Sequence, residues 1–411
     1  MLRAWTRVTR SRRTAVRPLS LVVGAVLGMA LASGCAQQSG RTSAGGSASP
    51  AASPWELPTS TMRWNDYACD LIARERIGQF PATRTLAYLN LAINNAIVVA
   101  RQQGRKPDGA AAGAAATVLT YIFPKDEQAI AARLAGETAA LGADGRRDFA
   151  SGVEIGRTAA AEVIAAAKAD RTGLAWSGPA PAGPDKWSSR MNPPGPPLGP
   201  RLGEARTFFL TTGADFRAPQ PPAVDSAAFR SAVAEVRTIA DTRTSEQLRI
   251  AQYWESLTGS FAAGQWNQVA RNAISAHGLS EPESARVLAM VHMVAADATI
   301  ACHDSKYTYW VPRPTQVDPQ IRLAIGVPNH PSYPSNHACI SGAIGHVLDA
   351  QFRDENGRYL AMGRQAGESR IYGGIHYRFD VDDGLVIARK VSARALEVGI
   401  PTDRPFMPLG R

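Results

Sequence analysis

The sequence predicts an all-α protein made of helical bundles. Apolar side chains recur at three- and four-residue steps in most segments between residues 56 and 400, which is the period of a helix packed on one face. We find no convincing strand-like alternation of apolar and polar residues longer than four residues. Glycine motifs of the dinucleotide-binding or Walker type are also absent from the sequence, which argues against α/β nucleotide-binding folds.

The first 34 residues are predicted to be an export signal and not part of the fold. Six arginines and no acidic residue accompany an apolar run from Leu19 to Ala32, and small residues follow. Cys35 comes next, as at a lipoprotein processing site, so we expect Cys35 to be lipidated. The protein is then exported, to the cell surface or beyond. The pair Arg12-Arg13 also resembles a twin-arginine signal, which leaves the export route open.

Residues 35–55 are rich in Ser, Gly and Ala and are predicted to form a flexible tether. Removal of residues 1–34 takes away six arginines and lowers the formal net charge from +10 to about +4. So small a charge gives no support for a nucleic-acid partner. No second long apolar run follows the signal, so contact with a membrane is expected only through the lipid anchor. The oligomeric state stays open.

Residues 56–172 are predicted to form an N-terminal helical part. The first helix, over 85–101, places Leu86, Leu89 and Ile93 on one stripe, and Asn90 and Asn94 lie on another line. For these two amides, bonds between packed helices are favoured over a ligand role. Ala-rich helices are expected over 110–123, 127–141 and 146–169, a composition that suits close helix packing.

Residues 173–222 are predicted to be a long connection, because eight prolines lie between Gly173 and Pro200. Trp176 and Trp187 indicate that this connection is held against the body of the protein, where it could close the mouth of a pocket. Residues 223–400 form a C-terminal helical part, with helices over 226–238, 245–256, 266–277 and 283–304. Capping boxes are expected at Thr244-x-x-Gln247 and Ser280-x-x-Glu283.

Three cysteines remain once Cys35 is set aside, and this odd number argues against a disulfide framework. Cys302 and Cys339 each lie near the motifs described next. Two small buried side chains are the favoured interpretation, with a bridge between them as the alternative.

Three short motifs concentrate charged and nucleophilic residues. The first holds Lys306 and Arg313, with Pro312 and Pro314 forcing Arg313 into an extended turn after the helix that carries Lys306. The second, Pro334-Ser335-Asn336-His337, opens a helix over 338–352, where free amides and the helix dipole favour an anion.

The third motif is Ser369-Arg370-x5-His376-x3-Asp380. His376 and Asp380 are four residues apart, so the carboxylate can bond one ring nitrogen and leave the other aimed outward as a nucleophile or ligand. A His–Asp pair that only stabilises a helix is the alternative for this motif alone. Together the motifs supply three cations, a hydroxyl, two histidines and a carboxylate, which is the set needed to hold and process a tetrahedral oxyanion. The sequence thus predicts an oxyanion site in the C-terminal bundle.

These motifs resemble those of the superfamily of type 2 phosphatidic acid phosphatases and vanadium-dependent haloperoxidases. The stretches Tyr333–Ala338 and Ser369–Asp380, with Pro81–Arg84 near the N-terminus, look most like its soluble, haloperoxidase-like bacterial branch. The resemblance covers residues from about 55 to 389. It implies an all-α enzyme whose site lies inside a helical bundle.

The resemblance also implies roles for individual residues. The equatorial oxygens of vanadate or phosphate would be held by Lys306, Arg313, Ser335, the amide of Asn336 and Arg370. His337 would be the acid–base group, His376 the nucleophile or vanadium ligand, and Asp380 its orienting partner. One residue departs from the pattern: Asn336 stands where the family usually has Gly. Its backbone angle is expected to be strained and its side chain to alter oxyanion binding.

Three functions stay open. In a vanadate-dependent haloperoxidase, the substrates would be halide and peroxide, with Lys306 polarising the peroxide. In a metal-free acid phosphatase, His376 would attack the phosphorus of a phosphate ester and form a phosphohistidine. In a non-catalytic phosphate-binding lipoprotein, the same residues would bind without turnover. Length and local sequence favour the first.

Overall fold

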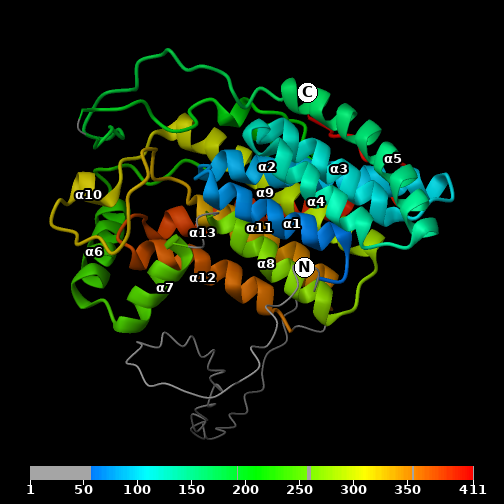
Figure 1. The fold of residues 1–411 in the computed structure, drawn as a ribbon. Coiled ribbons are helices and arrows are strands. Elements are labelled where there is room, and N and C mark those ends of the chain that lie inside the picture. Colours follow the sequence, from blue (N-terminus) through cyan, green and yellow to red (C-terminus); the bar gives the residue numbers. More distant parts are fainter. Residues whose placement is uncertain (1–56, 192, 257–260, 354–355, 411) are drawn as a thin grey trace, which may run out of the picture. The chain divides into compact units, whose positions relative to one another are not determined.

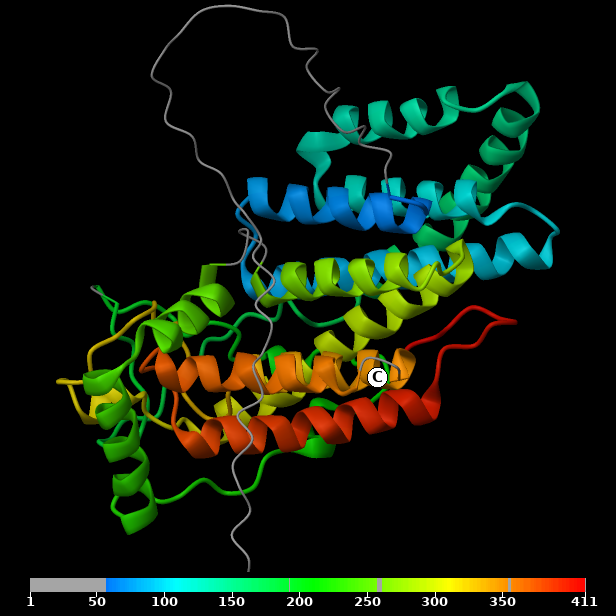
Figure 2. The same ribbon diagram turned by 90° about the horizontal axis from the view of Figure 1, so that it is seen from below.

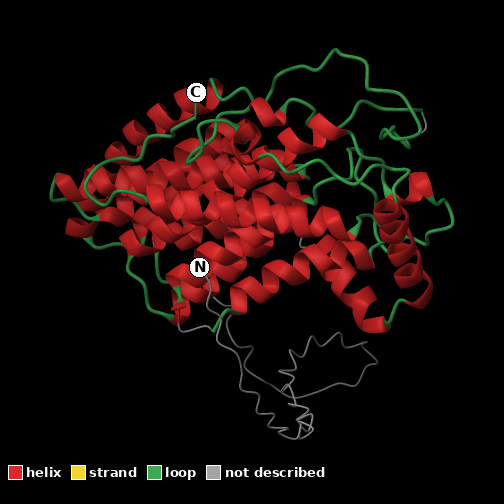
Figure 3. Cartoon of the chain, turned by 180° about the vertical axis from the view of Figure 1, so that it is seen from behind, coloured by secondary structure: helices red, strands yellow, loops and turns green. Residues whose placement is uncertain are grey.

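The computed structural model describes residues 57–191, 193–256, 261–353 and 356–410. The predicted export signal, Cys35 and the predicted tether lie outside them. In the described part of the chain every regular element is a helix, as predicted (Figures 1 and 3). The described residues form one compact unit.

Five helices precede the long connection: α1 (Ser60–Arg74), α2 (Gln79–Gln102), α3 (Pro107–Ile122), α4 (Glu127–Ala139) and α5 (Ala143–Lys168). Eight more follow it: α6 (Ala227–Thr242), α7 (Ser245–Ser256), α8 (Phe261–Ala276), α9 (Glu281–Tyr309), α10 (Pro314–Val317), α11 (Asn336–Gln351), α12 (Arg358–Tyr372) and α13 (Arg378–Val398). The predicted helices are all present, with ends shifted by a few residues. Both expected capping boxes form.

The long helix α9 lies between the two sets of helices (Figure 2). It packs against α2 on one side and against α11 and α13 on the other. Its residues are apolar nearly all round, and its stretch is long and apolar enough to cross a membrane, but 89% of the apolar window is buried inside the protein. We therefore interpret α9 as the core helix of the fold.

The helices α1, α12 and α13 were not predicted. In α12 the reason is composition, because Gly363 and Gly367 interrupt a segment rich in charged residues. The glycines serve close packing: a Cβ added at Gly363 would lie 2.7 Å from the carbonyl oxygen of Ser341 in α11. Tertiary contact between α11 and α12 thus outweighs a helix propensity that is weak locally.

Polar residues of the core are paired much as expected. The Asn90 side chain exchanges hydrogen bonds of 2.8 Å with Asn65 of α1, so the predicted amide contact between helices is confirmed. Asn94 donates a hydrogen bond of 3.5 Å to its chain neighbour Asn95, which lies on the same helix. Cys302 and Cys339 are buried and unbridged, which agrees with the favoured interpretation.

The Pro-rich connection lies against the segments that carry the first two motifs. The buried Trp187 donates its amide to the Trp310 carbonyl at 2.7 Å, and the Trp176 ring lies 6.2 Å from the Trp310 ring. Leu198 donates its amide to the Asn329 carbonyl at 2.8 Å. The two tryptophans therefore anchor the connection, as predicted.

The crossing of α3 and α5 depends on glycine. A Cβ added at Gly113 would lie 2.3 Å from the carbonyl oxygen of Val153, so Gly113→Ala must push the helices apart. We expect a loss of about 1–3 kcal/mol in the free energy of unfolding, measured by chemical denaturation. In the control Gly145→Ala the nearest atom would lie at 3.4 Å, and stability should be unchanged or higher. Equal stability of Gly113→Ala and the wild type would contradict this account of the packing.

Candidate active site

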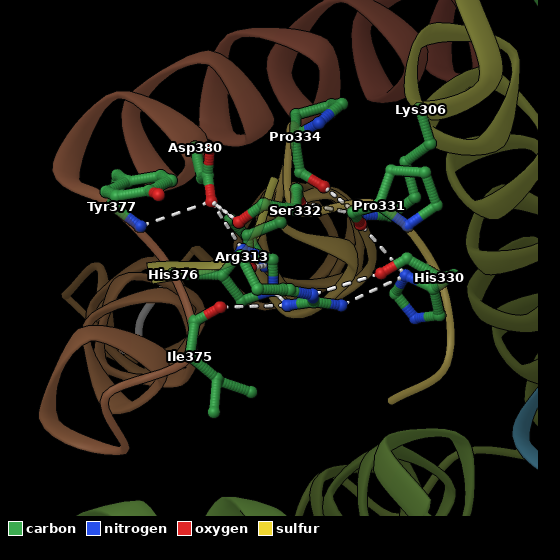
Figure 4. A network of polar contacts seen from close by, with 12 residues as sticks. Lys306, Arg313, His330, Pro331, Ser332, Pro334, Ile375, His376, Tyr377 and Asp380 are labelled. Carbon is green, nitrogen blue, oxygen red and sulfur yellow. Dashed lines mark hydrogen bonds and ion pairs between the residues drawn. The ribbon is translucent and has the colours of Figure 1, made fainter. Parts of the chain in front are cut away.

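The three motifs meet where the ends of five helices come together, and Figure 4 shows the part of this place that holds Arg313, His376 and Asp380. Lys306 lies in the last turn of α9, which ends at Trp310 in a left-handed conformation (φ 56°). Arg313 has extended angles (φ −73°, ψ 155°) directly before α10, as Pro312 and Pro314 predicted. Ser335 is the N-cap of α11, Arg370 lies in the last turn of α12, and Asp380 in the first turn of α13.

Lys306 is completely buried, and its ammonium group is capped by main-chain oxygens. Nζ donates to the carbonyls of Pro331 at 2.9 Å, Ser332 at 2.7 Å and Pro334. Burial lowers the pKa of Lys306 to about 8, because the charged form loses its hydration. With all three of its hydrogens bonded to carbonyls, Lys306 supplies charge to the site in this conformation and no free hydrogen-bond donor.

Arg313, His376 and Asp380 form one hydrogen-bonded line. Nδ1 of His376 lies 2.7 Å from Oδ2 of Asp380, and Nε2 lies 3.0 Å from Nη1 of Arg313. A guanidinium only donates, so Nε2 is the unprotonated nitrogen and Nδ1 carries the hydrogen that Asp380 accepts. The expected orientation of His376 by Asp380 is present in the geometry.

Asp380 is fully buried and accepts two further hydrogen bonds. Ser332 Oγ donates to its Oδ2 at 2.5 Å and the amide of Tyr377 at 3.1 Å. Burial raises the pKa of Asp380 to about 6, while the bond from Ser332 and the charge of Lys306 act in the opposite direction. The carboxylate is therefore ionised at neutral pH, as an acceptor for His376 must be.

His337 faces α7. Its Nε2 lies 3.0 Å from the carbonyl oxygen of Trp254, so Nε2 carries a hydrogen and Nδ1 is the nitrogen free to exchange a proton. Burial, followed by the charge of Arg370, holds the pKa of His337 well below its usual value, and the ring is neutral. Ser335 caps α11, because its hydroxyl accepts from the Ala338 amide. As the first residues of α11, Asn336 and His337 have amides with no partner one turn back in the helix.

Arg370 is paired within the protein. Its Nη1 lies 3.0 Å from Oε2 of Glu255 in α7, and Nη2 donates to the Ala251 carbonyl at 2.9 Å. The Glu255 side chain is 39% exposed, whereas the Arg370 side chain is only 1% exposed. Sequence reasoning did not identify Glu255, because its helix carries no motif and meets α12 only in the folded chain.

The expected backbone strain at Asn336 is wrong. Asn336 is the first helical residue of α11 and does not have a positive φ, so no glycine-only angle is needed. Its Nδ2 lies 3.1 Å from Nε2 of His303. Nδ1 of His303 donates to the Gly199 carbonyl at 3.0 Å, so its Nε2 carries no hydrogen and accepts one from Nδ2 of Asn336. This bond fixes which atom of the Asn336 amide is the nitrogen. Its Oδ1 is buried with no hydrogen-bond partner among the described residues.

Besides Glu255, two more residues of the site were missed by sequence reasoning. His330, taken as an ordinary polar residue, is 3% exposed, and its Nδ1 lies 3.0 Å from both Nη2 of Arg313 and the carbonyl oxygen of Pro331. Ser332 donates to Asp380. Both lie among the prolines just before Tyr333. Their position directly before the second motif is the feature of the sequence that could have identified them as site residues.

The charges of the site do not balance. Lys306 and Arg313 are buried beside a single buried carboxylate, Asp380, while Arg370 is paired with Glu255. Burial lowers the pKa of Arg313 to about 10, but the guanidinium stays charged at neutral pH. The described residues around His376 therefore carry one positive charge in excess, which favours an anion there.

Residues 286–397, which span almost all of this site, match the PAP2 superfamily. We call this matched part of the chain the PAP2 domain. No curated protein sequence matches the chain significantly.

The PAP2 domain lies in a fold shared with solved bacterial structures. A bacterial vanadium-dependent iodoperoxidase superposes with a TM-score of 0.73 at 20% identity, over 84% of this chain and 97% of that one. The holo-type structure of a bacterial vanadium-dependent chloroperoxidase gives 0.64 at 17% identity, over 84% and 96%. Its apo-type counterpart gives 0.63 at 16%, over 78% and 94%. The PAP2 domain and these similarities support an enzyme of the haloperoxidase or phosphatase type.

Glu255 competes with any anion for Arg370. We expect Glu255→Gln to bind vanadate or phosphate about 2–10-fold more tightly, because a carboxylate that repels the anion is removed. Isothermal titration at fixed salt measures the change. Glu246→Gln, on the exposed side of the same helix and paired with Arg249, is the control and should bind as the wild type does. Unchanged affinity in Glu255→Gln would remove Arg370 from the anion site.

Asp380 fixes which nitrogen of His376 is free. Asp380→Asn should weaken vanadate binding by about 10–100-fold, since the amide no longer holds the Nδ1 hydrogen in one tautomer. Asp383→Asn is the matched control, because Asp383 lies one turn on in α13 and accepts a hydrogen bond from Tyr333 and not from His376. Vanadium NMR of bound and free vanadate reads the affinity without any turnover, and equal affinities in the two variants would exclude the orienting role.

Proposed function

We propose that this protein is a vanadate-dependent, haloperoxidase-like enzyme that oxidises halide with hydrogen peroxide. One observation carries the proposal: the line Arg313–His376–Asp380, buried at the helix ends of a PAP2 domain. The likeness in fold to a bacterial vanadium-dependent iodoperoxidase over most of both chains supports it.

The residues present fit vanadate in charge and in donors. An excess positive charge and an unprotonated histidine nitrogen suit an oxyanion that also takes one nitrogen ligand. In this conformation Nη1 of Arg313 bonds the same nitrogen. Arg313 must therefore release Nε2 of His376 before a ligand binds there, and its freed N–H then becomes a donor for an oxyanion oxygen.

Each residue has a defined task in this proposal. Vanadate, when bound, supplies a Lewis-acidic centre that makes peroxide electrophilic. Asp380 keeps the His376 ring oriented, and Lys306 and Arg313 hold the negative charge. Arg370 and the first amides of α11 are further donors. His337 exchanges protons through Nδ1, since its Nε2–H stays on the Trp254 carbonyl.

The overall reaction is balanced in atoms and electrons. Halide, hydrogen peroxide and one proton give hypohalous acid and water. The halide loses two electrons, and the O–O bond of the peroxide breaks and accepts them. An organic acceptor then exchanges a C–H hydrogen for the halogen.

A metal-free acid phosphatase is the second candidate, and the match of residues 286–397 to the PAP2 superfamily favours it. His376 Nε2 would attack phosphorus. The ester oxygen would leave with a proton that His337 first takes up at Nδ1, because the hydrogen on its Nε2 stays on the Trp254 carbonyl. Water would then hydrolyse the phosphohistidine. Phosphate and vanadate have the same tetrahedral shape, so the same residues serve both reactions. Binding of phosphate without turnover is the third candidate.

We further propose that the enzyme acts outside the cytoplasm, held to a membrane through lipidated Cys35. The arginine-rich start, the apolar run and the small residues before Cys35 support this location. Metabolic labelling with a fatty-acid analogue tests it, and loss of label in Cys35→Ala is the expected result.

The decisive assay is halogenation of a dye by residues 56–411 with peroxide and either bromide or iodide, with and without vanadate. We expect turnover only with vanadate, and a loss of at least about 100-fold in His376→Ala, because the nitrogen ligand is removed. His346→Ala, a half-exposed histidine of α11 outside the site, is the control. If no halogenation is detected and the protein instead hydrolyses a phosphate ester in a reaction that vanadate inhibits, the phosphatase replaces the haloperoxidase as the proposed function. Binding without either reaction would leave the third.

A further inference from the structure

A separate cavity of about 360 Å³ lies between α2 and α9, on the N-terminal side of the candidate site. We call it the α2–α9 pocket. Its walls come from residues 80–88 of α2, residues 296–300 of α9, the segment 170–173 that follows α5, and residues 199–208 of the connection. The volume lies within the range of small-molecule sites, which measure about 300–1,000 Å³. None of the motif residues lines it.

Most of the pocket wall is apolar. Phe80 and Tyr88 contribute rings from α2, Ile300 a branched chain from α9, and Leu202 and Phe208 line the side formed by the connection. A wall of this kind selects a ligand with an apolar body, and rings on two sides suit an aromatic one.

The polar groups on the pocket wall are satisfied within the protein, with one exception. Arg84 pairs with Asp170 through Nε, and the other oxygen of Asp170 accepts from the amide and hydroxyl of Thr172 at 3.1 and 2.8 Å. The hydroxyl of Thr299 donates to the Ala295 carbonyl at 2.7 Å. These groups cancel one another in charge and offer little to a ligand.

Arg206 is the exception. Its Nε donates to the Gly410 carbonyl at 2.9 Å, and no carboxylate of the described residues pairs with it. The two terminal nitrogens of its guanidinium have no hydrogen-bond acceptor among the described residues, and the side chain is half-buried on the pocket wall. Since the charges of Arg84 and Asp170 cancel, Arg206 gives the pocket wall a net charge of +1. A carboxylate matches this planar pair of donors.

We propose that the α2–α9 pocket binds a small aromatic carboxylate, with its ring among Phe80, Leu202 and Ile300 and its carboxylate on Arg206. The pocket adjoins the candidate active site through two side chains. The Phe80 ring lies 4.3 Å from the ring of His303, which contacts Asn336 at 3.1 Å. The inference does not rest on the proposed function, because either reaction at His376 leaves the pocket as it is.

The test uses 2-naphthoate as the probe and 2-naphthylmethanol as its uncharged counterpart. Both are titrated into residues 56–411 by isothermal calorimetry in the presence of saturating phosphate, which covers the oxyanion site. We expect naphthoate to bind with a dissociation constant below about 1 mM, and more tightly than the alcohol. Arg206→Gln should weaken naphthoate at least about 10-fold and leave the alcohol unchanged, since one charge-assisted pair is lost. Arg201→Gln is the matched control, because Arg201 is paired with the exposed Glu204 nearby.

A second variant tests the location. Ala296→Phe places a ring in the pocket and should abolish binding of both probes, with unfolding followed separately by thermal melting. Equal naphthoate affinity in Arg206→Gln and the wild type would overturn the proposal, as would competition between naphthoate and phosphate. Should Ala296→Phe fail to fold, the charge-dependent difference in Arg206→Gln still decides.

Discussion

The burial of two cations at one end of a helical bundle is the constraint on which the site depends. An ammonium and a guanidinium without hydration cost several kcal/mol each unless donors and charge are matched. The chain meets this requirement with main-chain oxygens. Carbonyls of residues 331, 332 and 334 surround Lys306, and those of residues 330 and 375 bond Arg313. A proline-rich loop suits this task, because it has few amides of its own to compete for those oxygens.

The helices that the sequence predicted share a strong apolar stripe or an Ala-rich composition. Of the three helices that it did not predict, α12 shows one reason for the failure. Gly363 and Gly367 weaken its pattern, yet a Cβ at either position would collide with a neighbouring helix. At Gly363 it would meet the carbonyl oxygen of Ser341 in α11, and at Gly367 the side chain of Val381 in α13. Such packing depends on contacts between segments far apart in sequence, and no local window contains that information. The order of helices and the long connection were nonetheless predictable.

The site was predictable where chemistry is encoded in short spacings, as with His376 and Asp380. It was not predictable where a partner arrives from a distant segment. Glu255 reaches Arg370 across 115 residues, and Arg313 reaches His376 across 63. His330 was missed because a histidine flanked by prolines carries no periodic signal. Its burial depends on contact with Arg313, which only the folded chain shows. The expectation of backbone strain at Asn336 was wrong for a related reason. A family pattern tells which residue is usual at a position, but only the local backbone angles decide whether glycine is required there.

The central position of α9 bears on how this chain can be taken apart. The boundary of the PAP2 domain falls inside α9, near its beginning. The helix that carries Lys306 at one end packs along its length against α2, which lies outside that boundary. A fragment cut at the domain boundary would keep every motif residue and expose a long apolar face to water. The motif residues therefore cannot be separated from the N-terminal helices without exposing this face, and a gene fusion or domain exchange should transfer both helical parts together.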